Sequence, residues 1–217
     1  MFLSVFDMFK VGVGPSSSHT MGPMVAAAQF LDLMRASPFK FAGLRASLHG
    51  SLAFTGVGHA TDRATILGLA GFHPATYDAE KAEAVLAQIR ETRSIQAEGL
   101  PPLHFDPNAD LLFDYGPALE GHANGMILKA TDAQGDVILQ ETYYSIGGGF
   151  IVRAAEHNTG TAVDTSPVVP LPFSNATELL ARCRDFGLEM YQLVQRNERA
   201  WRTDAETRDA LLKIWHT

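Results

Sequence analysis

The stretch VGVGPSSSHTMGP, residues 11–23, places hydroxyl side chains and one histidine directly before an apolar run. The glycines and Pro15 permit a turn in which successive backbone N–H groups converge, and such a turn at the start of a helix favours a negative charge. The hydroxyls add neutral donors that could surround a carboxylate. The stretch therefore predicts either a cradle for a small anion or a serine-rich helix cap. Both interpretations rest on Ser16, Ser17, Ser18, His19 and Thr20.

A second stretch, GSLAFTGVGHATDRA, brings His59 to the predicted start of a helix after a glycine-rich turn. The positive end of the helix dipole opposes a positive charge on the ring, so we expect a neutral imidazole that can accept a proton. Asp62 could orient that ring, complement the helix dipole, or pair with Arg63 or Arg93. The alternative is a histidine that only occupies a tight turn.

The third candidate is YYSIGGGF, residues 143–150. Three consecutive glycines allow a ligand or another backbone to approach closely, and Tyr143 or Tyr144 could contribute a phenol. A simple bend in a sheet explains the same residues equally well. The other histidines follow no spacing that indicates chemistry, and we expect them to be surface or hydrogen-bonded residues: His49, His73, His104, His122, His157 and His216.

Helices and strands that position these stretches are indicated by periodicity and capping residues. Helical spacing predicts helices over 22–36, within GVGHATDRATILGLAGF with a stop at Gly71, and over 79–93 with Asp78 as the N-cap. Ser4 and Asp7 predict the cap of one further short helix. Alternation predicts a strand in KFAGLRASLHGSLA and more strands over 109–153, with DAQGD as a hairpin loop and the three glycines as a bend or bulge.

The C-terminal part differs in its residue pattern from the part before it. SPVVPLP is typical of an extended linker, and the remainder reads as helical. Thr203 and Glu206 predict a capping box for the last helix, which we expect to bury Leu211, Leu212 and Trp215 on one face. Since this helix has no stop signal, we expect the natural chain to continue. The predicted organisation is a domain over 1–160, a linker over 161–174 and a helical segment over 175–217.

Composition restricts the class of protein. The 217 residues carry a formal net charge of −7 without a Lys/Arg block, which argues against binding to nucleic acid or an anionic membrane. No window approaches the ~18 apolar residues of a membrane-spanning helix, so we expect a cytoplasmic protein. Cys183 is the single cysteine, which excludes an internal disulfide or a metal site built from this chain's thiolates alone. We expect Cys183 to be a small core residue of a helix.

Four segments together resemble a known family: SVFDMFKVGVGPSSSHTMGP, LHGSLAFTGVGHATDRA, HANGMILKATDAQGD and TYYSIGGGFIV. They are similar to the N-terminal β domain of bacterial iron–sulfur L-serine dehydratases (L-serine ammonia-lyases), and the likeness continues through LLARCRDFGLEMYQLVQRNERAW. The β domain of that family is also similar to small-molecule-binding regulatory domains of some phosphoglycerate dehydrogenases. The resemblance implies an α+β fold, with a mixed or antiparallel sheet packed with helices and followed by a helical C-terminal segment.

The resemblance also implies roles for residues. His59 would be the general base in the conversion of L-serine to pyruvate and ammonia, with His19 as an alternative or second proton carrier. No residue of this chain is expected to bind a metal. The substrate would be bound by Ser16, Ser17, Ser18, His19, Thr20, Gly58 and Gly148.

Cofactor and partners follow from the same resemblance. A [4Fe–4S] cluster would be held by cysteines outside this chain, in a catalytic α domain that lies against the β domain, so the isolated chain is expected to be inactive. A homodimer is also expected. Two other hypotheses stay open: a free-standing regulatory domain that binds a small carboxylate, and a separately encoded β subunit of a two-chain dehydratase.

Overall fold

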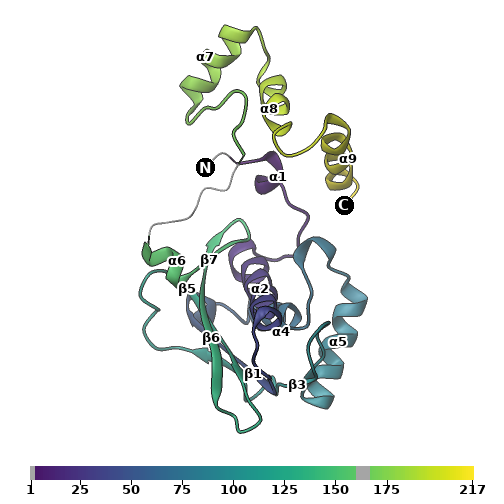
Figure 1. Cartoon of the computed structure of the whole chain (residues 1–217), viewed down its shortest axis with the longest axis vertical. Coiled ribbons are helices and arrows are strands. Elements are labelled where there is room, and N and C mark those ends of the chain that lie inside the picture. Colours follow the sequence, from purple (N-terminus) through teal and green to yellow (C-terminus); the bar gives the residue numbers. More distant parts are fainter. Residues whose placement is uncertain (1–2, 160–166) are drawn as a thin grey trace. The chain divides into compact units, whose positions relative to one another are not determined.

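The computed structural model describes residues 3–159 and 167–217, which fall into two compact units. One unit is Gly12–Ala162, and the other combines Met1–Val11 with Val163–Thr217. Each is described separately below, and Figure 1 labels the elements of both. Among the described residues, none of the helices has the length and apolar character that crossing a membrane requires.

The larger unit is built on a mixed sheet with the strand order β2-β3-β1-β5-β6-β7, in which β4 also pairs with β1. The central strand β1 runs parallel to β3 and β4 and antiparallel to β5, while β5, β6 and β7 form antiparallel pairs. The strands are β1 (Gly43–Gly50), β2 (Ser94–Ile95), β3 (Leu103–His104), β4 (Leu111–Asp114), β5 (Asn124–Thr131), β6 (Val137–Gly147) and β7 (Phe150–Arg153).

Helices α2 and α4 lie side by side on one face of this sheet (Figure 1). The unit's helical elements are the turn η1 (Ser17–Met21), α2 (Gly22–Ala36), α3 (Ser51–Phe54), α4 (Thr61–Leu69), the turn η2 (Pro74–Thr76), α5 (Ala79–Thr92) and α6 (Ala154–Thr159). Alternate residues of β1 and β5 point at the helices because a strand has a side-chain period of two. The resulting core includes Phe30 and Leu31 of α2, Leu48 of β1 and Leu128 of β5, all fully buried.

The smaller unit is helical. It consists of α1 (Val5–Met8), α7 (Ala176–Phe186), α8 (Met190–Glu198) and α9 (Asp204–Trp215). Glu198 is buried at 2% exposure and joins the two ends of the chain within this unit, because its carboxylate accepts the Ser4 hydroxyl (2.8 Å) and the Val5 backbone N–H (2.6 Å).

Several sequence expectations are confirmed. The fold is α+β with a mixed sheet and a helical C-terminal segment. Helix α2 spans 22–36 as predicted, Asp78 caps α5, and both capping boxes are present, Ser4 with Asp7 and Thr203 with Glu206. DAQGD joins the hairpin β5–β6, and the Gly147–Gly149 segment is the turn between β6 and β7.

Other expectations were wrong. The face of α9 expected to be buried is open: Leu211, Leu212 and Trp215 are 47%, 42% and 82% exposed. Cys183 is only half-buried, since α7 buries no residue within the described chain. The segment after 175 is helical as expected, and it is divided into α7 and α8 where Gly187 takes a left-handed C-cap conformation (φ +60°). The expected linker over 161–174 lies partly outside the described residues, and 167–174 forms no helix or strand.

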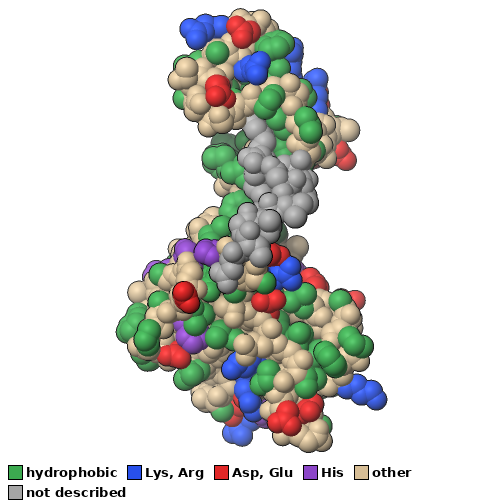
Figure 2. Space-filling view, turned by 60° about the vertical axis from the view of Figure 1, so that its left-hand side comes forward, with side chains coloured by type: hydrophobic (Ala, Val, Ile, Leu, Met, Phe, Trp, Pro, Cys, Tyr) green, Lys and Arg blue, Asp and Glu red, His purple; other side chains and the backbone are tan. Residues whose placement is uncertain are grey.

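Charged side chains of both signs are interspersed on the face seen in Figure 2, and histidines appear on one side of the sheet-containing unit. This mixed surface agrees with the absence of a basic block in the sequence.

Candidate active site

The serine-rich stretch forms the first turn of a helix. Ser16 is the N-cap residue, and its hydroxyl accepts the backbone N–H of His19 at 3.2 Å. The π-helical turn η1 follows and continues directly into α2. The sequence placed the helix start near Gly22, where α2 does begin, and the Ser16 cap adds the turn η1 in front of it. The first N–H groups of a helix lack intrahelical partners, so the stretch combines a cap with the positive end of a helix.

Thr20 connects this turn to the second candidate stretch. Its side chain is buried at 3% exposure, and its hydroxyl donates to the carbonyl oxygen of His59 at 2.8 Å. The Thr20 hydroxyl oxygen also accepts the backbone N–H of Ser16 at 3.2 Å. The buried Thr20 side chain therefore links the segment that carries His19 to the segment that carries His59 and does not face solvent.

His59 is oriented by its own turn. Its Nδ1 lies 3.0 Å from the carbonyl oxygen of Thr55, and its backbone N–H donates to Gly56 at 3.1 Å. A carbonyl oxygen can only accept, so Nδ1 carries the hydrogen and Nε2 holds the lone pair. In the neutral ring, Nε2 is thus the atom that can take up a proton.

Asp62 does not orient that ring nitrogen, because the partner of Nδ1 is the Thr55 carbonyl. The arginines named as its alternative partners form ion pairs elsewhere, Arg63 with Glu83 and Arg93 with Asp106. Asp62 instead stands in the first turn of α4, where a carboxylate complements the helix dipole.

The two histidines form a pair. The ring centroids of His19 and His59 are 4.8 Å apart, with an angle of 39° between the planes. The Nδ1 atom of His19 lies 2.9 Å from the Ser18 hydroxyl, and Nε2 lies 2.9 Å from the Ser51 hydroxyl. Burial lowers the pKa of His19, and the nearby His59 lowers it further, against a smaller opposing effect of Ser51. A neutral His19 is therefore favoured beside His59.

The glycine-rich turn of β6–β7 approaches the same helix start. A Cβ atom on Gly149 would lie 3.2 Å from Met21, and one on Gly22 would lie 2.0 Å from the Ser145 hydroxyl. The close neighbour of Gly149 is the Met21 side chain and not the backbone or ligand that the sequence suggested. The Ser145 hydroxyl is buried and has no hydrogen-bond partner within the described chain.

The remaining predicted residues are less constrained. Ser17, Gly58 and Gly148 are exposed. Gly58 has an ordinary backbone conformation and meets only the Thr55 carbonyl near its missing Cβ, whereas Gly148 takes a left-handed conformation (φ +60°). The structure brings Ser16, Ser18, His19, Thr20 and His59 together and leaves these three at the surface.

Comparison with known proteins decides the family. A family model described as "Serine dehydratase beta chain" matches residues 4–156, which is most of the chain.

The chain belongs to this family.

Among curated relatives, an L-serine dehydratase of Streptomyces coelicolor is 42% identical over 217 residues, covering 99% of this chain and 48% of the relative. L-serine dehydratase 1 of Escherichia coli is 40% identical over 218 residues, with 99% and 47% coverage. A relative of the same name in Haemophilus influenzae is 38% identical. The chain thus spans about half the length of the serine dehydratases that it matches.

In this chain, sequence reasoning missed three groups near the histidine pair: Ser51, the Thr55 carbonyl and Ser145. Ser51 directly follows the end of β1, and a strand end is a place where polar side chains commonly serve a site. That signal was present in the sequence. The Thr55 carbonyl is a backbone group, so the residue types in the sequence do not indicate its hydrogen bond to His59.

The residues of this chain cannot by themselves hold an iron–sulfur cluster. Such clusters are held by several cysteine thiolates, and the sequence has only Cys183. No group of three or more His, Cys, Asp or Glu side chains suited to a metal ion lies within residues 3–159 and 167–217.

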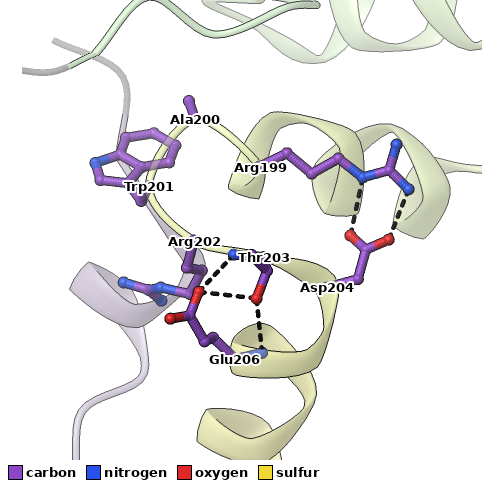
Figure 3. A pocket seen from close by; sticks show the side chains of 7 residues that line it. All are labelled: Arg199, Ala200, Trp201, Arg202, Thr203, Asp204 and Glu206. Atoms are coloured by element: carbon purple, nitrogen blue, oxygen red, sulfur yellow. Dashed lines mark hydrogen bonds and ion pairs between the residues drawn. The ribbon is translucent and has the colours of Figure 1, made fainter.

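The helical unit has its own pocket, of about 520 Å³, at the turn between α8 and α9 (Figure 3). Its polar side chains bind one another: Arg199 forms a bidentate ion pair with Asp204, and Thr203 forms the capping box with Glu206 (Figure 3). These contacts belong to the helix ends, and Arg202 lies over the Phe6 ring and 3.7 Å from the Glu198 carboxylate, so we assign this pocket no ligand.

Proposed function

We propose that this chain is the part of an L-serine dehydratase that binds the substrate carboxylate and supplies the base for its dehydration to pyruvate and ammonia. The observation that carries the proposal is the pair of His19 and His59 at the start of the helix formed by η1 and α2. Membership of the family and the names of the relatives support L-serine as the substrate.

The carboxylate of serine would bind at the first turn of η1. There the positive end of the helix and the exposed hydroxyl of Ser17 offer neutral donors to an anion, while Ser18 lies beside Nδ1 of His19. Ser16 contributes indirectly, because its hydroxyl already caps the helix. Hydrogen bonds to the carboxylate would also stabilise the charge that spreads into it when Cα loses its proton.

His59 would act as the general base. The Cα–H bond breaks, its electron pair stays on the substrate, and the proton goes to Nε2, since Nδ1 donates to the Thr55 carbonyl. Loss of the β-hydroxyl then gives an aminoacrylate, which tautomerises to an imine and is hydrolysed to pyruvate and ammonia. The group that assists departure of the hydroxyl has no counterpart among the residues of this chain described here.

We further propose that this group is a [4Fe–4S] cluster bound by cysteines outside this chain, in the half of the relatives that this chain does not cover. Exposed aromatic side chains beside the site suit contact with such a partner. Phe54 and Tyr115 are 64% and 59% exposed and pack edge to face at 5.4 Å, and Val57 is 71% exposed in the same loop as His59.

The helical unit offers a second apolar surface for the same partner. A groove of about 1050 Å³ is lined by apolar residues of α1, α8 and α9, among them Val5, Met190, Val194, Leu211 and Leu212. By itself the chain is expected to release no pyruvate. We also propose a cytoplasmic location.

A chimera tests the function. This chain replaces the aligned half of the Streptomyces coelicolor enzyme, and the purified anaerobic protein is assayed for pyruvate release from L-serine. We expect turnover with the chimera and none with the isolated chain. His59→Ala should lower kcat by ~10²-fold or more, the usual effect of losing a general base. His73→Ala, at an exposed position remote from the pair in sequence, is the matched control.

A separate variant tests the proposed binding of the substrate carboxylate. Ser17→Ala should raise KM for L-serine more than it lowers kcat, because it removes a donor to a group that is bound before and during reaction. Turnover near that of the parent chimera in His59→Ala would remove His59 from the role of base. An inactive but folded chimera that binds small carboxylates would favour the alternative of a regulatory binding domain.

A further inference from the structure

Ser51 is held rigidly at the junction of β1 and α3. Gly50 has φ +55° and ψ −130°, and a Cβ there would lie 2.4 Å from the Ala123 carbonyl oxygen, so only glycine fits. The Ser51 N–H donates to that same oxygen at 2.8 Å. The Ser51 carbonyl accepts both the backbone N–H (3.1 Å) and the hydroxyl (2.8 Å) of Thr55. The backbone on both sides of the Ser51 side chain is therefore fixed.

From this position the Ser51 hydroxyl reaches the ring of His19, with 2.9 Å between Oγ and Nε2. The other ring nitrogen, Nδ1, is 2.9 Å from the Ser18 hydroxyl. A neutral imidazole has one N–H donor and one acceptor, so one of these serines must donate to the ring and the other must accept from it.

We assign the direction of these bonds by starting from the helix cap, because the distances alone do not show which atom donates. The Ser16 hydroxyl accepts the backbone N–H of His19, and we let its own hydrogen point to the Ser18 oxygen at 3.5 Å. Ser18 then donates to Nδ1, and Nε2–H donates to Ser51. In this order the hydrogens run from Ser16 to Ser18, from Ser18 to His19 and from His19 to Ser51. The ring hydrogen of His19 is then on Nε2, whereas that of His59 is on Nδ1.

We propose that Ser51 is a positioning residue of the site, which accepts a hydrogen bond from Nε2–H of His19 and thereby fixes the orientation and tautomer of that ring beside His59. The effect of Ser51 on catalysis rests on the function proposed above, but its hydrogen bond to His19 does not. With the ring fixed and neutral, no second positive charge stands 4.8 Å from the imidazole that must accept the substrate proton. His59 is the titratable group that acts on His19 from the facing loop.

Nuclear magnetic resonance of the full chain, with ¹⁵N-labelled histidine, tests the structural content without any assay of activity. Histidine ring ¹⁵N shifts report the tautomer, and a His19→Gln variant identifies the signals. We expect the Nε2–H pattern for wild-type His19 above its pKa. In Ser51→Ala the two ring nitrogens should shift toward each other, as in a mixture of tautomers, whereas Ser51→Thr should keep the wild-type pattern because it keeps a hydroxyl.

The matched control is Ser47→Ala. The Ser47 hydroxyl lies 2.8 Å from Nε2 of His49, so this variant should change the His49 signals and leave those of His19 as they are. An Nδ1–H pattern for wild-type His19, or ring shifts of His19 that are the same in Ser51→Ala, would overturn the proposal. Circular dichroism of each variant shows that the chain is folded.

Kinetics of the chimera supply the second arm. Ser51→Ala should lower kcat by about tenfold, the effect of one lost hydrogen bond of ~1.4 kcal/mol, with a smaller change in KM. Ser51→Thr should recover most of that loss. Equal kcat in Ser51→Ala and the parent would overturn the catalytic consequence. A chimera without any turnover would count against the proposed function, while the resonance measurement still decides the role of Ser51.

Discussion

At the residue scale, the two histidines differ in the hydrogen-bond partners of their ring nitrogens. His59 donates from Nδ1 to a backbone carbonyl, which leaves Nε2 as a lone pair. His19 has a serine hydroxyl at each nitrogen, so neither atom is available without displacing a neighbour. This contrast favours His59 as the base and His19 as a fixed, neutral neighbour.

Two adjacent tyrosines provide a stability prediction. Tyr143 is fully buried, and its hydroxyl has no hydrogen-bond partner within the described chain, whereas the Tyr144 hydroxyl donates to the Glu120 carbonyl. Burial raises the pKa of Tyr143. Tyr143→Phe should leave the free energy of unfolding unchanged or raise it by up to ~1 kcal/mol, and Tyr144→Phe should lower it by ~1 kcal/mol.

Urea unfolding, followed by circular dichroism, measures both tyrosine variants. A loss of stability in Tyr143→Phe as large as that in Tyr144→Phe would contradict the prediction, because it would mean that the buried Tyr143 hydroxyl has a stabilising partner.

Acid should destabilise the larger unit through its buried imidazoles. Burial lowers the pKa of His19 and of His49, so the unfolded chain binds protons that the folded chain resists. Stability from these groups is fully present above the unfolded pKa of about 6.5 and is lost as the pH falls below it toward the folded values.

We therefore expect the free energy of unfolding to be lower at pH 5.5 than at pH 7.5. The difference between the two pH values should be smaller in His49→Gln than in the wild type, since one of the two groups has been removed. An equal difference in both proteins, from urea unfolding at each pH, would show that His49 does not resist protonation in the folded chain.

At the scale of elements, the site depends on where β1 ends. Gly50 turns the chain out of the sheet, so the next ten residues form α3 and the turn that carries His59. Strand β1 is central, with β4 on one side and β5 on the other, so its end is held at a fixed position. The helix start at Ser16 is held against this junction by Thr20.

A pair of glycine variants tests this junction. Gly50→Ala should lower the free energy of unfolding by about 3 kcal/mol or more, because it combines a positive φ with a Cβ placed 2.4 Å from a carbonyl oxygen. Gly71→Ala also meets a positive φ (+89°) but has open space around the Cβ, and should cost only ~1 kcal/mol. Similar costs in thermal or urea unfolding would argue against a crowded junction at Gly50.

At the scale of the whole molecule, the chain ends are organised by contacts that skip most of the sequence. Ser4 and Glu198 are 194 residues apart in the chain, yet they are hydrogen-bonded within the helical unit. Arg202 adds a charge 3.7 Å from the same carboxylate. The N-terminal segment is therefore part of the C-terminal unit and not of the sheet-containing one.

Removal of this carboxylate should loosen one unit selectively. Glu198→Ala leaves the Ser4 hydroxyl and the Val5 N–H without their acceptor, at a cost of about 3 kcal/mol. Hydrogen exchange should accelerate in α1 and α8 and stay unchanged in β1 and β5. The exposed capping residue Glu206 is the control, since Glu206→Ala should cost only ~1 kcal/mol. Faster exchange of the sheet in Glu198→Ala would contradict the division into units.

The sequence by itself determined the features that depend on neighbours in the chain. Helix α2, the caps at Asp78 and Thr203 and the hairpin at DAQGD arise from interactions within a few residues, so residue types report them directly. The short strands β2 and β3 and helix α3 escaped notice because two to four residues carry no readable period. The open face of α9 was misjudged because apolar spacing shows which residues share a face, not whether anything covers it.

The family and the candidate histidines were also evident from sequence motifs, but only the tertiary structure decided how the histidines are used. His19 meets Ser51 across 32 residues, and Thr20 meets His59 across 39. Such contacts exist because β1 and α2 pack in one core, which brings the end of one to the start of the other. Which ring nitrogen carries the hydrogen then follows from hydroxyl and carbonyl groups whose positions are set by that packing.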